Sequence, residues 1–316
     1  MERISAVICT YNEEDNIEAC IDSVYGVDEV VVADDGSTDK TVELAKACGA
    51  RVHRRKDWSE RASQVEVNEF VERFGWQPSF EDGTRIRNGH LEAREAQSFA
   101  RNDWIVVPDA DERVTWDLKK VRRLLPLSDQ IVCDFVHSHK PNGEPETTFT
   151  ITKMFRRSLS TIDARTHTVV LPNGRIVSTH YMRIDHWPKT LHKQTYVLPI
   201  LEYSVAKEDD LRSRFYLGRE YYNQDQCEHA ITLFNHYLKD AKWMPEIGHA
   251  RLYMAYCFWK LKQGDSARKN AIQAFLINPD HKQAIEFLAN TCTEPWRSKW
   301  QHIAENATNK DVLFIV

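Results

Sequence analysis

The chain has 316 residues, 42% hydrophobic and 28% charged, which is ordinary for a globular protein. Its 42 Lys and Arg against 47 Asp and Glu give a net charge of −5, so overall charge does not attract it to nucleic acid or anionic membranes. The seven cysteines never form C-x-x-C, which argues against a disulfide framework or a zinc site. Without a signal peptide or the roughly 20 apolar residues of a membrane span, we expect a cytoplasmic protein with no integral membrane contact.

The N-terminal part alternates strands and helices. Apolar or β-branched runs at residues 4–9, 29–33 and 51–55 predict strands buried in a sheet. Residues 11–26 and 37–49 show helical periodicity, each ends at a glycine, and Ser37 or Thr38 could cap the second helix. Such alternation with short connections predicts an α/β fold with a mostly parallel sheet and right-handed crossovers.

Polar clusters follow three of the predicted strands: TYNEE at 10–14, DDGSTD at 34–39 and PDADE at 108–112. Ligands of such sheets bind beyond the carboxyl ends of the strands, so we expect the clusters to share one crevice. Neither G-x-G-x-x-G nor G-x-x-x-x-G-K-[ST] occurs, which excludes the two common phosphate cradles. A nucleotide would therefore be held by its base and ribose, and its phosphates would need a metal ion.

The stretch DWIVVPDADERV at 103–114 crowds Asp109, Asp111 and Glu112 at a strand end. Neighbouring carboxylates raise one another's pKa unless a cation lies between them. Asp109 and Asp111 lie on the same side of an extended segment, so one can reach a ribose while the other holds Mn²⁺ or Mg²⁺ on a diphosphate. The alternative is a solvated turn that caps the following helix.

The order of these segments resembles the family 2 glycosyltransferases of the GT-A fold. Residues 7–24 look like the opening strand and helix, 29–45 like the nucleotide-binding strand end, and 93–112 like an arginine helix followed by D-x-D. The resemblance covers about residues 1–195. It implies metal-dependent, inverting transfer of a sugar from a nucleotide-diphosphate sugar, a UDP-sugar by preference, to a hydroxyl- or thiol-bearing acceptor.

The same resemblance implies roles for individual residues. Asp35 would accept a hydrogen bond from the base, Asp109 would contact ribose, and Asp111 would bind the metal. One departure is Pro108, which lacks an N–H and should mark the end of the strand. The positions that match nucleotide-binding residues are Thr10, Tyr11, Glu13, Asp34, Asp35, Arg94 and Asp109.

A third metal ligand is expected from a later segment, where similar enzymes often carry histidine. The stretch STHYMRIDHWPKTLHK offers His180, His186 and His192. His186 closes an alternating run typical of a strand, so it is our choice as a metal ligand together with Asp111. Imidazole beside carboxylates would favour Mn²⁺ over Mg²⁺.

The catalytic base is not assigned by the sequence. Inverting transfer needs a group that takes the acceptor's proton. Similar proteins often carry His-Glu where this chain reads His167-Thr168, so the expected glutamate is missing. The catalytic candidates, in order, are Asp163, Glu112, His167 and Asp185.

Residues 58–88 interrupt the strand–helix rhythm. This stretch is rich in charge and aromatic residues and predicts an insertion with a short helix at 65–74, which could shape the donor or acceptor side of the site. Further on, residues 132–157 read as a hairpin with its turn at 141–145.

The period changes near residue 200, where helix pairs begin. Residues 212–239 and 249–279 align at a constant offset of 37, with Gly218 opposite Ala255, and 281–292 supply a half repeat. This resembles tetratricopeptide repeats, although a generic helical bundle is the alternative. We expect two domains, a GT-A domain at 1–200 and a repeat domain at 201–316. Because few repeats are rarely stable alone, the repeat domain should pack on the catalytic domain or form a homodimer.

The acceptor and the activity itself have alternatives. The acceptor could be a saccharide, a protein or peptide, or a hydroxymethylated DNA base. Basic residues at 51–56 and 85–87 would favour a polyanion if they converge. A non-catalytic nucleotide-sugar-binding protein with interaction repeats is an alternative that Asp109 and Asp111 argue against. A nucleotidyltransferase usually shows a glycine-rich phosphate turn, which this chain lacks.

Overall fold

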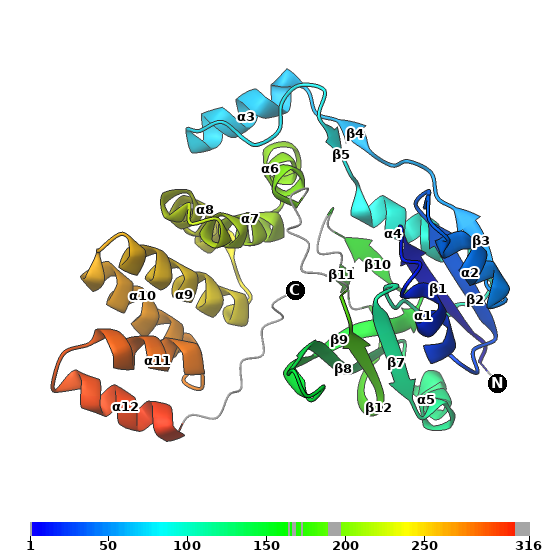
Figure 1. The fold of residues 1–316 in the computed structure, drawn as a ribbon. Helices are drawn as coiled ribbons and strands as arrows, with labels where there is room; N and C mark the ends of the chain where they lie inside the picture. The colour runs from blue at the N-terminus through cyan, green and yellow to red at the C-terminus, as the bar shows by residue number, and fades with distance from the viewer. Residues whose placement is uncertain (1, 164, 166–168, 172, 189–196, 307–316) are drawn as a thin grey trace. The chain divides into compact units, whose positions relative to one another are not determined.

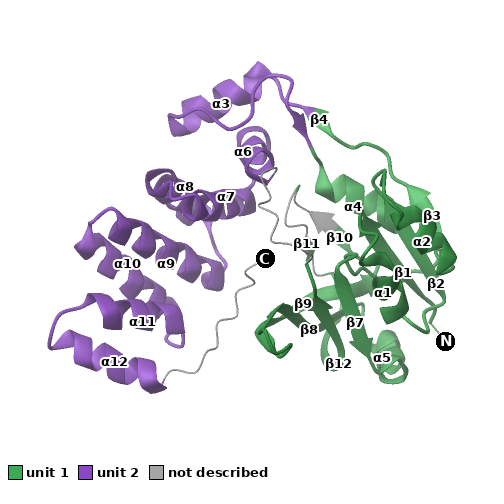
Figure 2. Ribbon diagram, viewed as in Figure 1, with its two compact units in different colours: residues 1–60, 87–194 green, residues 61–86, 195–316 purple. Residues whose placement is uncertain are grey.

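The computed structural model describes residues 2–163, 165, 169–171, 173–188 and 197–306. The chain divides into two compact units that each take two pieces of the sequence (Figure 2). Unit 1 consists of residues 1–60 and 87–194, and unit 2 of residues 61–86 and 195–316. No helix in the described part of the chain is both long and apolar enough to cross a membrane.

Unit 1 is built on a mixed sheet that has eight strands among the described residues (Figure 1). Four neighbouring strands, β3, β2, β1 and β6, run parallel, as the apolar runs predict. Beyond β6 the pairings with β9 and β8 are antiparallel, β12 lies parallel to β8, and β7 closes the edge antiparallel to β12. In order across the sheet the strands are β3 (Arg51–Arg54), β2 (Glu29–Asp34), β1 (Ile4–Thr10), β6 (Trp104–Val106), β9 (Pro145–Arg156), β8 (Gln130–His139), β12 (Ile176–His186) and β7 (Glu112–Trp116).

Helices pack on this sheet and bury its apolar side chains. Ile4 and Trp104, from adjacent strands, are fully buried in one core cluster, and Ile8 is fully buried in another with helix residues. The remaining elements of unit 1 are α1 (Ile17–Ser23), α2 (Thr41–Ala47), α4 (Gly89–Ser98), α5 (Leu118–Leu124), the 3₁₀ turn η1 (Leu125–Leu127), and the short strands β10 (Thr161–Asp163) and β11 (Val169–Leu171). The mostly parallel N-terminal sheet with flanking helices agrees with the predicted α/β class.

The start of α2 differs from the prediction. The helix begins at Thr41, after Lys40, and not at the expected caps Ser37 or Thr38. The N–H groups of Ser37 and Thr38 are already used in the preceding turn, donating to Asp34 and Asn12 respectively. Because those donors are bound outside the helix, the first helical turn forms later in the chain.

The segment 107–111 carries the D-x-D motif across the sheet. β6 ends at Val106, so Pro108 lies outside the ladder as expected. β7 begins at Glu112, on the opposite edge of the sheet from β3. The segment therefore connects a central strand to an edge strand, which brings Asp109 and Asp111 to different places along the site.

Unit 2 contains consecutive antiparallel helix pairs. α7 packs on α8, α9 on α10 and α11 on α12 (Figure 1). The expected half repeat is therefore wrong, because α11 is followed by a second helix at α12. The helices of unit 2 are α3 (Gln64–Phe74), α6 (Val197–Glu208), α7 (Leu211–Asn223), α8 (Cys227–Asp240), α9 (Met244–Lys260), α10 (Gly264–Ile277), α11 (Lys282–Thr291) and α12 (Trp296–Asn306).

Small residues lie where paired helices approach closely. Ala230, Ala255 and Ala267 are fully buried, and a Cβ added at Gly218 would lie 2.9 Å from the ring of Phe234. These are positions that the repeat alignment singled out. Their burial explains why the offset is visible in the sequence, while the tetratricopeptide identity of the pairs stays a prediction.

The stretch between β4 (Glu60–Arg61) and β5 (Arg85–Ile86) packs within unit 2. α3 lies against α6. The buried carboxylate of Glu202 on α6 accepts hydrogen bonds from the backbone N–H of Ser79 at 2.6 Å and from the hydroxyl of Tyr221 at 2.6 Å. Trp76 donates to the same hydroxyl at 3.0 Å. The predicted role of this stretch beside the donor or acceptor stays a prediction.

Candidate active site

The loops that follow β1 and β2 are joined by hydrogen bonds. The N–H of Asp35 donates to the carbonyl of Thr10 at 3.0 Å, and that of Asn12 to Ser37 Oγ at 2.9 Å. Asn12 has a φ of +54°, a left-handed conformation that asparagine tolerates better than most residues. Its side-chain oxygen accepts from the N–H of Thr38 at 2.8 Å. Two of the predicted polar clusters are thereby held side by side.

Asp34 shapes this region from within the turn. Its carboxylate accepts the N–H of Gly36 at 2.8 Å and that of Ser37 at 3.1 Å, and the residue is only 4% exposed. Gly36 has a φ of +93°, and a Cβ there would lie 2.8 Å from the guanidinium of Arg54. The carboxylate of Asp34 is thus bound to the turn, and a nucleobase contact by Asp35 stays a prediction.

Asp35 is held by two arginines. Arg55 donates from Nε at 2.5 Å and forms a second, short bond from its other nitrogen, while Arg87 donates at 3.1 Å. Glu92 accepts from Arg87 at 2.5 Å and lies 3.8 Å from Arg55. The Arg55 side chain is 5% exposed against 20% for Asp35, so a buried guanidinium orients a more accessible carboxylate. Partners 20 and 52 residues away leave no local sequence signal for this arrangement.

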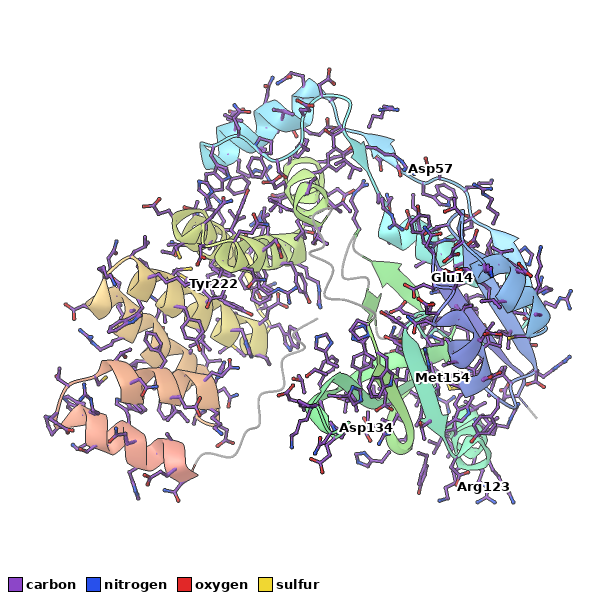
Figure 3. The ribbon with its side chains drawn as sticks, viewed as in Figure 1. Glu14, Asp57, Arg123, Asp134, Met154 and Tyr222 are labelled. Carbon is purple, nitrogen blue, oxygen red and sulfur yellow. The ribbon has the colours of Figure 1, made fainter. Side chains whose placement is uncertain are left out.

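Asp109 lies beside β1 and is paired with a lysine. It forms an isolated parallel bridge with Cys9, and its carboxylate is 2.8 Å from the amine of Lys153. Lys153 precedes Met154 on β9 (Figure 3) and also lies 2.9 Å from Glu112. The Asp109 side chain remains 62% exposed. The cation between these two carboxylates is therefore Lys153, which the sequence did not single out.

Glu112 is buried under the D-x-D segment. The residue is 3% exposed, and its carboxylate accepts the N–H of Asp109 at 2.9 Å. Burial raises its pKa to about 7, the Asp109 charge adds to that, and Lys153 opposes it. As a candidate base, Glu112 is already occupied by partners within the chain. Its placement favours a role in positioning Asp109.

Asp111 and His186 meet at the other end of the segment. Asp111 Oδ2 is 3.2 Å from His186 Nε2, and His186 Nδ1 is 3.3 Å from the carbonyl of His137. Burial acts to raise the pKa of Asp111, but the hydrogen bond and charge of His186 bring it below its usual value. Burial acts to lower the pKa of His186, but Asp111 raises it above its usual value. The two groups stabilise each other's charged forms.

The Asp111–His186 pair has the chemistry to hold a divalent cation. The described residues contain no group of three or more His, Cys, Asp or Glu side chains that could enclose a metal. Mg²⁺-type sites, however, usually take one or two protein ligands and complete the shell with water and substrate phosphate. One carboxylate oxygen and one imidazole nitrogen fit such an open site, and the imidazole favours Mn²⁺.

Other predicted residues border the site to different degrees. Tyr11 is 57% exposed after β1. The N–H of Glu13 donates to Thr41 at 2.7 Å and its carboxylate accepts from Asn16 at 2.9 Å. Thr10 is buried, and within the described chain its hydroxyl has no hydrogen-bond partner. Arg94 lies exposed on α4, the helix that also carries Glu92.

The structure describes only some of the remaining candidates for the catalytic base and the third metal ligand. Asp163 ends β10, a strand that packs near α4. Asp185 is buried and paired with His139 and Arg183. His180 pairs at the surface with Asp134, labelled in Figure 3. His167, Thr168 and His192 lie outside the described residues.

Comparison with known proteins identifies the family to which this chain belongs. The fold is that of a GT-A-like glycosyltransferase, followed by C-terminal helices. The model of the family named glycosyl transferase family 2 matches residues 5–177, more than half of the chain, and the protein belongs to that family. The predicted resemblance and enzyme class are confirmed by this match.

Individual relatives match shorter parts of the chain. Uncharacterized glycosyltransferases of Rickettsia typhi and Rickettsia felis are 35% and 37% identical over 120 residues, which is 38% of this chain. The chain spans about a third of the length of these relatives, 31% and 32% respectively. Glucosyl-3-phosphoglycerate synthase from Mycobacterium tuberculosis, in complex with Mn²⁺, UDP and glucosyl-3-phosphoglycerate, matches 65% of this chain and 80% of its own. That match has 19% identity and a TM-score of 0.38.

Proposed function

We propose that this protein transfers a sugar, with inversion, from a UDP-sugar to a hydroxyl- or thiol-bearing acceptor and that a divalent cation, Mn²⁺ by preference, assists. The observation that carries the proposal is the pairing of Asp111 with His186 at 3.2 Å, two residues after the other D-x-D carboxylate, Asp109. When bound, the cation would neutralise the diphosphate leaving group. Membership of glycosyl transferase family 2 supports a nucleotide-sugar donor.

The chain's own residues divide the remaining work. Asp35 would accept a hydrogen bond from an N–H of the nucleobase, and Arg55 and Arg87 orient its carboxylate. The Asp109 side chain is 62% exposed, so its carboxylate can accept hydrogen bonds from ribose hydroxyl groups. The ion pair with Lys153 fixes the orientation of that carboxylate. Fixed carboxylates bind with less loss of side-chain entropy than mobile ones.

The proton of the acceptor needs a base. Glu112 is bound to Lys153 and almost fully buried, and Asp185 is bound to His139 and Arg183. Those pairings favour Asp163 or His167 as the base. Replacing each with an amide or with Gln and following donor hydrolysis and transfer separately would distinguish a base from a structural residue.

Thermal denaturation with UDP or GDP, in Mn²⁺ or in EDTA, tests the proposal. A ligand that binds only the folded protein adds about 2.7 kcal/mol of stability at a hundredfold excess over its Kd. We expect a UDP-dependent rise in Tm that needs Mn²⁺ and is lost in His186→Ala. His180→Ala, on the same strand but paired at the surface, is the matched control and should retain it. Equal shifts with EDTA and with Mn²⁺ would reject the metal role.

A further inference from the structure

An exposed tryptophan lies directly after the proposed metal ligand. Trp187 is 44% exposed and stacks on the imidazole of His139, with ring centroids 3.8 Å apart and planes 10° from parallel. His139 ends β8, and Trp187 follows the end of the neighbouring strand β12. We call Trp187, His139, Asp185 and Arg183 the Trp187 platform.

Buried polar groups hold this platform in place. His139 Nε2 lies 3.2 Å from Asp185 Oδ1, and Asp185 Oδ2 accepts from Arg183 Nε at 2.9 Å. The side chains of His139 and Asp185 are only 7% and 8% exposed. Burying a carboxylate and an imidazole is costly unless they are paired. Here the buried His139–Asp185 pair holds in place an indole that remains exposed to solvent. Trp187 therefore does not act as a hydrophobic core residue.

The platform is tied to the proposed metal site by the backbone. The N–H of Trp187 donates to the carbonyl of Asp111 at 2.8 Å, and Trp187 follows His186 in sequence. Asp35 follows β2 and Asp109 bridges to β1, whereas Asp111 pairs with the end of β12, four strands beyond β1. The metal pair and the platform therefore adjoin each other at the ends of β8 and β12, both on the far side of β1 from the proposed nucleobase-binding end.

This order matches the order of parts in a nucleotide sugar. Base, ribose and diphosphate come in sequence, and the transferred sugar and the acceptor lie beyond the diphosphate. If Asp35 binds the nucleobase and Asp111 holds the cation on the diphosphate, the platform lies beside the part of the site that receives the transferred sugar and the acceptor. This step rests on the proposed function, because it uses the donor to orient the site.

We propose that Trp187 is the stacking surface of an acceptor subsite and that it binds the pyranose ring of a neutral saccharide. The C–H face of a pyranose is apolar and packs flat on an indole, whose ring combines a large apolar face with a polar edge. Hydroxyl groups at the ring edge can reach the exposed guanidinium of Arg183, 48% open to solvent.

Fluorine NMR of the full chain labelled with 5-fluorotryptophan tests the subsite directly. Trp187→Phe assigns the Trp187 resonance among those of the nine tryptophans. The probes are methyl α-glucopyranoside, methyl α-mannopyranoside and methyl β-galactopyranoside, added to protein saturated with UDP and Mn²⁺. We expect at least one of them to shift the Trp187 resonance in a saturable way. Trp259, also 44% exposed but in unit 2, is the internal control and should not move.

Variants then separate stacking from general structure. Trp187→Ala should weaken binding of the responding glycoside at least tenfold, and Trp187→Phe should restore most of it, since a smaller aromatic face remains. The Kd for UDP with Mn²⁺ should change less than twofold in both, which also shows that the variants are folded. If the wild-type protein does not bind UDP with Mn²⁺, that result would instead count against the proposed function.

Three outcomes overturn the inference while leaving the proposed function intact. They are equal shifts at Trp187 and Trp259, a Trp187 response to a UDP-sugar but to none of the glycosides, and a Trp187 response to a short single-stranded oligonucleotide but to no glycoside. The first means non-specific contact, the second a donor-sugar subsite and the third a nucleic acid acceptor.

Discussion

The amine of Lys153 lies 2.9 Å from the carboxylate of Glu112, and their side chains are only 13% and 3% exposed. The same amine reaches Asp109 at 2.8 Å, so one lysine compensates two carboxylates of the D-x-D segment. Burial acts to lower the pKa of Lys153, but these carboxylates raise it far above its usual value. The two carboxylates therefore stabilise the charged form of Lys153.

We expect Lys153→Met to destabilise the protein by about 3 kcal/mol at pH 8, because it leaves a buried carboxylate without its partner. Urea unfolding measures the change. Lys140→Met, which removes an exposed pair with Glu144, is the control and should cost less than about 1 kcal/mol. A loss for Lys153→Met no larger than that of the control would contradict the importance of the buried pair.

The Asp111–His186 pair predicts a pH dependence. The folded pKa of His186 lies above 6.5, so its stabilisation is complete below that pH and is lost as pH rises through the folded value. The folded pKa of Asp111 lies below 3.8, so its contribution is present above that pH and is lost on acidification. His186→Ala should therefore cost more stability at pH 5.5 than at pH 8.5.

Mn²⁺ binding should depend on pH in the opposite direction from this stabilisation, so the affinity for Mn²⁺ should rise as pH rises. A cation needs the neutral imidazole, so protonated His186 competes with Mn²⁺. We expect the apparent Kd for Mn²⁺ to tighten by up to about tenfold per pH unit as pH rises toward the folded pKa of His186. Isothermal titration with UDP present measures it, and a pH-independent Kd between pH 5.5 and 7.5 would exclude His186 as a ligand.

Replacing Asp35 and replacing Asp111 should affect different kinetic parameters. Asp35→Ala removes a proposed base contact and should chiefly raise KM for the donor, whereas Asp111→Ala should abolish turnover at any donor concentration. Initial rates across donor concentrations separate the two. Similar, mild losses of kcat/KM in both variants would sink the assignment.

Two glycines of unit 2 form a matched test of packing. A Cβ at Gly218 would lie 2.9 Å from the fully buried ring of Phe234, whereas one at Gly248 would meet Ile277 at an ordinary 3.4 Å. We expect Gly218→Ala to destabilise by about 1–3 kcal/mol through overpacking. Gly248→Ala should be neutral or stabilising by up to about 1 kcal/mol, since alanine favours helix. Chemical denaturation distinguishes them, and equal effects would argue against close crossing of α7 and α8.

A buried histidine predicts acid sensitivity of unit 2. His249 is 5% exposed, and burial together with His281, 4.6 Å away between ring centroids, lowers its pKa to about 3. Because the unfolded value is 6.5, protonation favours the unfolded chain, and stability is lost as pH falls below 6.5. His249→Leu should reduce the loss of stability between pH 7 and pH 4.5, while the exposed control His302→Gln should not. An unchanged slope in His249→Leu would show that other groups dominate.

Much of unit 1 could be predicted because its signals are local. A buried parallel strand must be apolar throughout, so runs such as residues 4–9 identify it, and parallel strand ends bring their polar loops to one edge. The partners of the site could not be predicted. Lys153 is 44 residues from Asp109, and Arg87 is 52 from Asp35, so only tertiary structure pairs them.

The insertion shows the same limit at a larger scale. Its helix was visible in the sequence, and α3 spans Gln64–Phe74 where residues 65–74 were expected. Its packing depends on Glu202, more than a hundred residues later, so no local pattern could place it in unit 2. The packing of the repeat helices on the catalytic domain or on a second copy, and the boundary at residue 200, stay predictions.

The division of the chain has a consequence for its synthesis. Residues 61–86 belong to unit 2, yet 108 residues, 87–194, separate them from the rest of that unit. At a translation rate of about 5–20 residues per second, roughly 5–20 s pass before the helices that bury Phe70 and Phe80 emerge. During that interval unit 1 is being completed around an apolar segment that still lacks its partners.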